Sequence, residues 1–207
     1  MSNPLFGIDT DRGMFRRYED PLYLLGCSLP DDPDGLLLGL VSEGVRRLRQ
    51  LDRFYSEAWM CVNRAVAVQQ LAEADREKFS SSKPTLQQAI DDATDAAEAF
   101  YLFGFRLFDI TRILQTKCNA NLQIVEPKNF NHVRNHLIIH PERYKQELLW
   151  SAHVTNKDGR GVVIKIKRTK TRHPITHDPG LGPNATELQE YIERWIIQFS
   201  EHLSRAT

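Results

Sequence analysis

The chain has 207 residues, no formal net charge at pH 7, 41% hydrophobic residues and 26% charged residues. This length is enough for one domain with a sizeable core that needs no disulfide or metal to hold it together. Because the charges balance, the molecule as a whole is not expected to be attracted to nucleic acid or to an anionic membrane. Any binding of nucleic acid would therefore depend on a local basic patch.

The cysteines and the apolar runs bear on the cellular location. Cys27, Cys61 and Cys118 are odd in number, lie far apart and form no CxxC pair, which argues against a disulfide scaffold and a structural zinc site. The first residues lack the basic-then-apolar order of a signal peptide, and no apolar run approaches the roughly 18 residues of a membrane span. We therefore expect a soluble protein of the reducing cytoplasm with no membrane partner.

Residues 1–35 are rich in Pro, Gly, Asp and Arg, which predicts an irregular N-terminal segment with a short helix near 21–27. From residue 36 to about 79, apolar residues recur every three or four positions, the spacing of an amphipathic helix. The Ser80–Pro84 stretch interrupts this helical pattern and predicts the end of the helix, because proline suits the first turn of a following helix. A second long helix, about 85–116, would complete an antiparallel helical hairpin.

The apolar stripes of the long helices and of the last helix predict the core. The three stripes are Val41, Val45, Leu48, Leu51, Tyr55, Ala58, Val62, Ala65 and Val66; Leu86, Ile90, Ala93, Ala97, Phe100, Phe103, Leu107, Ile110 and Leu114; and Leu188, Ile192, Trp195, Phe199 and Leu203.

After a polar connection at 117–130, a third, shorter helix is predicted at about 129–140. Two β-branched runs separated by an Asp-Gly turn signal predict a β-hairpin at about 148–170. The last helix is predicted to begin at Asn184, with Glu187 three residues later as in a capping box. The predicted fold class is mainly α: one domain over 36–207, a bundle of about four helices with the two-stranded hairpin inserted before the last one.

The segment with chemical character comes after the predicted hairpin of long helices. Three of the seven histidines fall between residues 132 and 140. Arg134 and His140 suit phosphodiester cleavage if they meet in one cleft, for example across a two-fold axis. The imidazole titrates near neutrality and can exchange the proton of a ribose 2′-hydroxyl. The guanidinium offers a fixed fork of donors to phosphate oxygens.

The run Arg134-Asn135-His136-Leu137-Ile138-Ile139-His140 resembles the motif of the HEPN superfamily. That motif is an Arg, usually followed by a polar residue, with four to six residues before a His. Here five residues intervene and Asn135 holds the polar position. The surroundings are similar as well, because two long helices and a connection precede the motif. The resemblance covers about residues 36–150 and the final helix, and leaves out the N-terminal 35 residues and the β-hairpin.

The resemblance implies a metal-independent endoribonuclease, a hydrolase-like activity that needs no cofactor, with a composite site at a homodimer interface. Arg134 would contact phosphate, His140 would act as general acid and base, and Asn135 would orient one of them. The implied partners are RNA and a second copy, with an antitoxin or other regulatory protein if the chain belongs to a toxin–antitoxin or phage-defence system. Some members of the superfamily have lost activity, so a helical module that binds a protein or nucleotide partner is the alternative. A purely structural all-α protein is a third reading.

Two further readings concern metal and nucleic acid. His132, His136 and His140 share a helix face, and two of them could hold a divalent ion, but three in line span about 12 Å and no HExxH pattern is present. We expect no metal site. The one basic run is predicted to contact nucleic acid, or else to protect an exposed strand edge from pairing; it contains Lys165, Lys167, Arg168 and Lys170.

Overall fold

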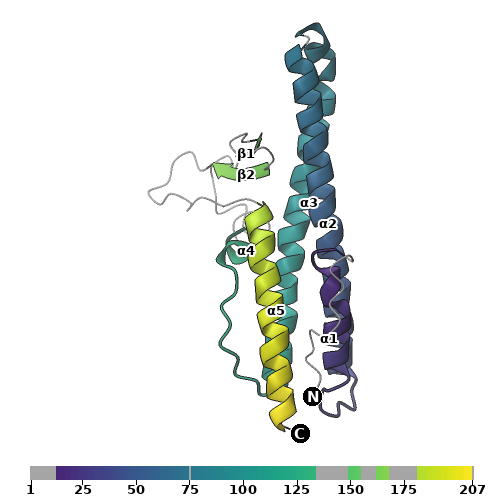
Figure 1. The fold of residues 1–207 in the computed structure, drawn as a ribbon, viewed down its shortest axis with the longest axis vertical. Helices are drawn as coiled ribbons and strands as arrows, with labels where there is room; N and C mark the ends of the chain where they lie inside the picture. The colour runs from purple at the N-terminus through teal and green to yellow at the C-terminus, as the bar shows by residue number, and fades with distance from the viewer. Residues whose placement is uncertain (1–12, 75, 134–148, 155–161, 168–180, 207) are drawn as a thin grey trace. The chain divides into compact units, whose positions relative to one another are not determined.

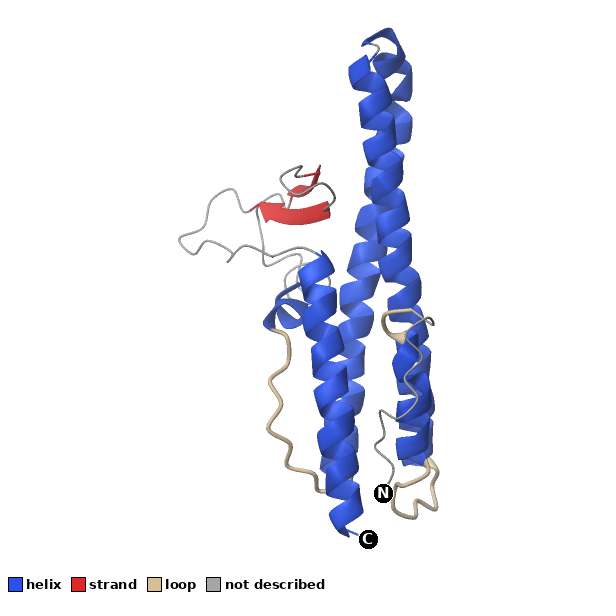
Figure 2. Ribbon diagram, viewed as in Figure 1, coloured by secondary structure: helices blue, strands red, loops and turns tan. Residues whose placement is uncertain are grey.

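The computed structural model describes residues 13–74, 76–133, 149–154, 162–167 and 181–206, and the chain is mainly helical over these ranges (Figure 2). A single 3-10 turn, Arg16–Tyr18, leads into α1 (Glu19–Gly26), the short helix expected near residues 21–27. The other helices are α2 (Leu36–Ala74), α3 (Arg76–Lys117), α4 (Lys128–Val133) and α5 (Leu181–Ala206) (Figure 1). Among the described residues, no helix combines the length and apolarity needed to cross a membrane.

Two short strands precede α5. Strand β1 (Leu149–Val154) pairs antiparallel with β2 (Val162–Lys167), and the register runs from Leu149 opposite Lys167 to Val154 opposite Val162. Residues 155–161, where the turn is predicted, lie outside the described residues. The hairpin insertion as a whole therefore stays a prediction.

The chain divides into two compact units. The first unit comprises Met1–Asp52, Leu102–Phe130 and Thr186–Thr207, and the second comprises Arg53–Tyr101 and Asn131–Ala185. Each of the long helices α2 and α3 contributes residues to both units.

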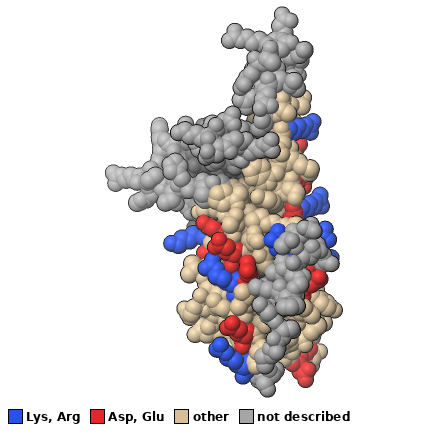
Figure 3. Space-filling view, viewed as in Figure 1, with Lys and Arg blue, Asp and Glu red and all other residues tan. Residues whose placement is uncertain are grey.

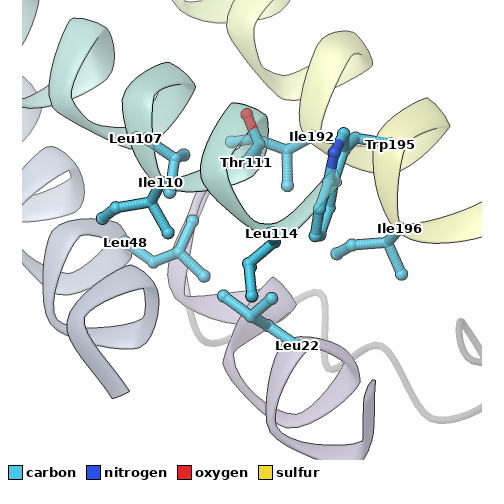
Figure 4. A pocket seen from close by; sticks show the side chains of 9 residues that line it. All are labelled: Leu22, Leu48, Leu107, Ile110, Thr111, Leu114, Ile192, Trp195 and Ile196. Atoms are coloured by element: carbon cyan, nitrogen blue, oxygen red, sulfur yellow. The ribbon is translucent and has the colours of Figure 1, made fainter. Parts of the chain in front are cut away.

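In the core of the first unit, side chains of α1, α2, α3 and α5 face one another. These side chains surround a small apolar cavity, about the size of one water molecule. Figure 4 shows side chains from α1, α2, α3 and α5 converging on it: Leu22, Leu48, Leu107, Ile110, Thr111, Leu114, Ile192, Trp195 and Ile196. Most of the residues predicted as apolar stripes in this unit are buried, which confirms the helical period inferred from the sequence.

In the second unit, aromatic rings bring α2 and α3 together. Tyr55 of α2 lies with its ring centroid 5.8 Å from that of Phe100 and 6.2 Å from that of Trp59. Tyr101 follows Phe100 on α3 and is fully buried. Phe100, predicted as part of the apolar stripe of this helix, is therefore a core residue.

The predicted break at 80–84 is wrong. Helix α2 ends at Ala74 and α3 begins at Arg76, so the serine run and Pro84 lie inside α3. Serine costs a helix only a few tenths of a kcal/mol per residue, so three in succession do not end one. Pro84 removes one N–H donor from the hydrogen-bond ladder of α3, a cost that a helix of 42 residues tolerates here.

The predicted start of the last helix is also wrong. Helix α5 begins at Leu181, three residues before Asn184, with Pro183 in its first turn, where proline is well tolerated. Asn184 is fully buried, and its side-chain amide donates a hydrogen bond to the Tyr101 hydroxyl at 2.6 Å. Asn184 therefore pairs a buried phenol rather than capping the helix.

An ion-paired carboxylate ties α1 to α2 in the first unit. Arg49 donates to Glu19 Oε2 from Nε and Nη2 at 2.9 and 2.7 Å, and Arg16 Nε donates to Oε1 at 3.0 Å. Burial alone would raise the pKa of Glu19, but the hydrogen bonds from the two arginines outweigh it and hold the pKa below its ordinary value.

Replacing Glu19 by glutamine should therefore flatten the acid limb of the stability curve. A lowered folded-state pKa contributes stability above the unfolded pKa of about 4.3, and this contribution is lost as pH falls through the folded pKa. Because both arginines are more than half exposed, we expect the contribution to be at most about 1 kcal/mol. Urea unfolding at pH 7 and pH 3 measures it, and a Glu19→Gln deficit that is equal at both pH values would contradict it.

Candidate functional site

The central residues of the predicted site, Arg134, Asn135 and His140, lie outside the described residues. The structure describes the elements that flank them in the chain. Helix α4 (Lys128–Val133) ends at the residue before Arg134, and α5 begins at Leu181. Of the third helix predicted at 129–140, residues 129–133 are helical, and residues 134–140 lie outside the described residues.

The start of α4 is fixed to the first unit by one aromatic side chain. Phe130 is fully buried, and its ring meets Phe108 of α3 edge-on, with centroids 5.5 Å apart. Phe108 in turn packs edge-on against Tyr191 of α5 at 4.8 Å. Such aromatic pairs contribute roughly 0.5–1.5 kcal/mol each beyond the burial of their area. The chain therefore enters the motif from a fixed point on α3 and α5.

Gly104 of α3 makes room for this ring. A Cβ atom at residue 104 would lie 2.2 Å from Phe130 Cε1 and 2.5 Å from Cδ1, far inside any allowed contact. The glycine is therefore required by the close approach of Phe130, and not by its own backbone conformation. Sequence reading missed this pair, although an isolated glycine between Phe103 and Phe105 in a helical stripe signals a close neighbour.

Gly104→Ala should displace the Phe130 ring and loosen α4. Overpacking of this kind costs about 1–3 kcal/mol, more than the roughly 1 kcal/mol that alanine gains over glycine in a helix. We expect a net loss of stability in urea unfolding. The double variant Gly104→Ala with Phe130→Leu should recover part of the loss, because the smaller side chain removes the clash. A single variant as stable as wild type would contradict this packing.

Hydrogen bonds at one end and an ion pair near the other fix the connection between α3 and α4. Asn119 adopts a positive φ of 53° just after α3, and the Ala120 N–H bonds the Gln115 carbonyl at 2.8 Å, as in a Schellman C-cap. Near the other end, the Arg112 guanidinium pairs with the Glu126 carboxylate, which raises the pKa of Arg112. This connection therefore fixes where α4 begins.

A buried pair of hydroxyl groups joins α3 and α5 next to the Phe108 ring. The Thr111 and Tyr191 hydroxyl oxygens are 2.7 Å apart, and Thr111 also donates to the Phe108 carbonyl at 2.9 Å. Burial raises the pKa of Tyr191 far above its ordinary value. Tyr191 therefore stays protonated at neutral pH, and we assign it to packing and hydrogen bonding rather than to proton transfer.

The predicted nucleic-acid residues are described only in part. Lys165 and Lys167 belong to β2, opposite Ser151 and Leu149 of β1, whereas Arg168 and Lys170 lie outside the described residues. On the face of the molecule drawn in Figure 3, basic and acidic residues of the described ranges are interspersed, with no large field of one sign.

Of the three histidines considered as metal ligands, only His132 falls in the described ranges, which also contain all three cysteines. There, no group of three or more His, Cys, Asp or Glu side chains could hold a metal ion. His132 lies in α4, and His136 is outside the described residues. The three cysteines are free, and burial raises the thiol pKa of Cys61 and Cys118, which disfavours the nucleophilic thiolate.

Comparisons of the chain with protein-family models, with curated proteins and with solved structures found no match.

Proposed function

We propose that this chain is a metal-independent endoribonuclease of HEPN type. The observation that carries the proposal is the motif Arg134-Asn135-(x)4-His140 directly after a helix that Phe130 anchors to α3 and α5. The order of elements supports it, because two long helices and a held connection precede the motif and a long helix comes after it. An active site on a rigid frame needs such fixed entry points.

The proposed chemistry uses side chains alone. His140 accepts the proton of a ribose 2′-hydroxyl as its oxygen attacks the adjacent phosphorus, and Arg134 stabilises the charge that develops on the phosphate oxygens. The bond from phosphorus to the 5′-oxygen of the next nucleotide breaks, and that oxygen takes up a proton from the protonated imidazole of His140. The products are a 2′,3′-cyclic phosphate and a 5′-hydroxyl. Asn135 orients Arg134 or His140.

The proposal includes the setting of the site. Two copies bring their motifs together, the hairpin at about 148–170 is inserted before α5, and its basic run, Lys165 to Lys170, contacts the RNA backbone. The protein acts in the cytoplasm, in a toxin–antitoxin or defence system, where a regulatory protein restrains it.

Contacts to single-stranded phosphates predict that log Kd for RNA changes with log[salt] by about 0.7 per contact.

The alternative is a helical module that binds a protein or nucleotide partner without cleavage. The observation that favours it is a set of exposed apolar side chains in the second half of α1 and the first turn of α2: Tyr23, Leu24, Leu36 and Leu38. RNA backbone contacts do not call for such side chains, whereas protein interfaces do.

The test is incubation of the purified full chain with a structured RNA in EDTA and, separately, in Mg²⁺. The proposal predicts equal cleavage in both. Cleavage that appears only with the divalent ion would replace it with a metal-dependent site, and binding without cleavage in either buffer would favour the alternative.

A further inference from the structure

One side of the first half of α2 is uncovered in the described structure. We call it the α2 face; its residues are Gly35, Leu38, Gly39, Ser42, Arg46 and Arg49, and all six are exposed. Gly35 directly precedes α2, and the others, apart from the neighbours Leu38 and Gly39, are three or four residues apart, so they lie on one side of the helix. Helix α1 lies on another side, where a Cβ at Gly26 would come within 3.1 Å of Val41 Cγ1.

The centre of the α2 face is small and apolar. Leu38 is 54% exposed, and no atom beyond the neighbouring backbone of α2 lies within 4 Å of the position a Cβ would take at Gly39. Ser42, the next residue along the face, is also small. Small residues on a helix surface allow a second helix to approach closely, and an exposed leucine beside them provides apolar area to bury.

The two ends of the α2 face carry opposite charge. Asp31 and Asp34 are exposed in the turn before α2, and neither has a hydrogen bond or ion pair within the described structure. At the other end, the side chains of Arg46 and Arg49 are 62% and 60% exposed. Glu43 and Glu19 hold these guanidinium groups without using all of their N–H donors.

The spacing of the charges makes the α2 face complementary to itself. The midpoint between Asp34 and the pair Arg46 and Arg49 falls near residues 40–41, between Gly39 and Ser42. Each charged end lies about 10 Å from that midpoint along the helix. A second copy rotated by 180° about the midpoint would therefore place its acidic end against the arginines of the first.

We propose that the α2 face binds a second copy of this chain in an antiparallel, two-fold arrangement. Gly39 and Ser42 of the two copies meet at the crossing, Leu38 is buried beside them, and Asp31 and Asp34 of each copy face Arg46 and Arg49 of the other. Such an isologous contact uses one patch twice. It is a separate contact from the one that would bring the two motifs together, and the proposal does not rest on the ribonuclease function, because self-association through the α2 face occurs with or without RNA cleavage.

Gly39→Gln tests the crossing. The open space at Gly39 accepts a side chain in the monomer, and glutamine is a better helix former than glycine, so the helix content and the unfolding transition of dilute protein should not fall. The dimer Kd should rise at least about tenfold, because the side chain separates the two helices. Sedimentation equilibrium of the full chain over a concentration series, without RNA, measures the Kd. Ala67→Gln, exposed on α2 outside the α2 face, is the matched control and should leave the Kd unchanged.

A charge exchange tests the register. Arg46→Glu and Asp34→Lys should each weaken self-association about tenfold, since each contact occurs twice. Mixing the two variants should restore a heterodimer, because each altered charge then faces an opposite one. Arg205→Glu on α5, equally a reversal of an exposed arginine, should change nothing. A wild type that stays monomeric, a dimer insensitive to Gly39→Gln, or a mixture that forms no heterodimer would each overturn the proposal.

Discussion

Replacing His140 by alanine is expected to slow RNA cleavage by about 10²–10⁴-fold, the usual contribution of a general acid or base. Replacing Arg134 by alanine removes the donor that faces the developing charge on the phosphate and should cost about 10²–10³-fold. Both losses should appear mainly in kcat, since neither side chain is proposed to supply most of the RNA affinity. Single-turnover cleavage with excess enzyme measures them free of product release.

Two neighbouring histidines provide matched controls for these variants. His132→Ala and His136→Ala remove the same side chain within the same stretch of sequence, but His132 precedes the proposed motif and His136 occupies one of its unspecified positions. Both should cleave within a few-fold of wild type. If His136→Ala were as inactive as His140→Ala, the assignment of the general acid and base to His140 would be wrong. Circular dichroism of all four variants excludes loss of fold as the cause.

Asp52→Ala is expected to destabilise the first unit by about 2–4 kcal/mol. The Asp52 carboxylate accepts the backbone N–H of Phe15 at 2.9 Å and of Arg16 at 2.7 Å, and the side chain is almost fully buried. Alanine leaves the two N–H groups without their acceptor, and each such loss costs about 1–3 kcal/mol. Gly13, with a positive φ of 105°, lies against the same carboxylate, so the whole N-terminal turn depends on Asp52.

Urea unfolding at pH 7 measures this loss, with two comparison variants. Asp52→Asn keeps one acceptor oxygen and should lose about half as much. Asp109→Ala removes a carboxylate whose ion pairs with Arg106 and Arg112 lie at the surface, and should cost less than about 1 kcal/mol. Equal effects of Asp52→Ala and Asp109→Ala would contradict the role assigned to the buried carboxylate.

The helices were predictable because their apolar residues follow a period of 3.6. Leu48, Phe100 and Trp195 are buried as their stripes predict. The helix boundaries were less predictable, because local signals compete with packing. Ser80–Ser82 and Pro84 look like a break but lie inside α3, and Asn184 looks like a cap but hydrogen-bonds Tyr101 in the interior. In both cases a local sequence signal suggested a helix boundary, but contacts with distant parts of the chain decide where the helix begins or ends.

Contacts between residues far apart in sequence were the hardest to foresee. The N-terminal 35 residues were expected to be irregular, yet Phe15 and Tyr18 are buried in the first unit and Asp52 holds their turn. Gly104 and Phe130 form a pair that no local pattern specifies, because their fit depends on where the connection from α3 returns. The proposed motif was chosen for its residue types alone and lies outside the described residues, whereas the contact of Phe130 with Gly104 just before it could not be predicted from the sequence.

We propose that Arg134 and His140 cleave RNA without a metal, and the chemistry of the new RNA ends produced in EDTA, by wild type beside His140→Ala, tests this. Wild type should leave 2′,3′-cyclic phosphate and 5′-hydroxyl ends, and the variant should leave none above background. Ends bearing a 3′-hydroxyl and a 5′-phosphate, or equal cleavage by wild type and His140→Ala, would contradict it.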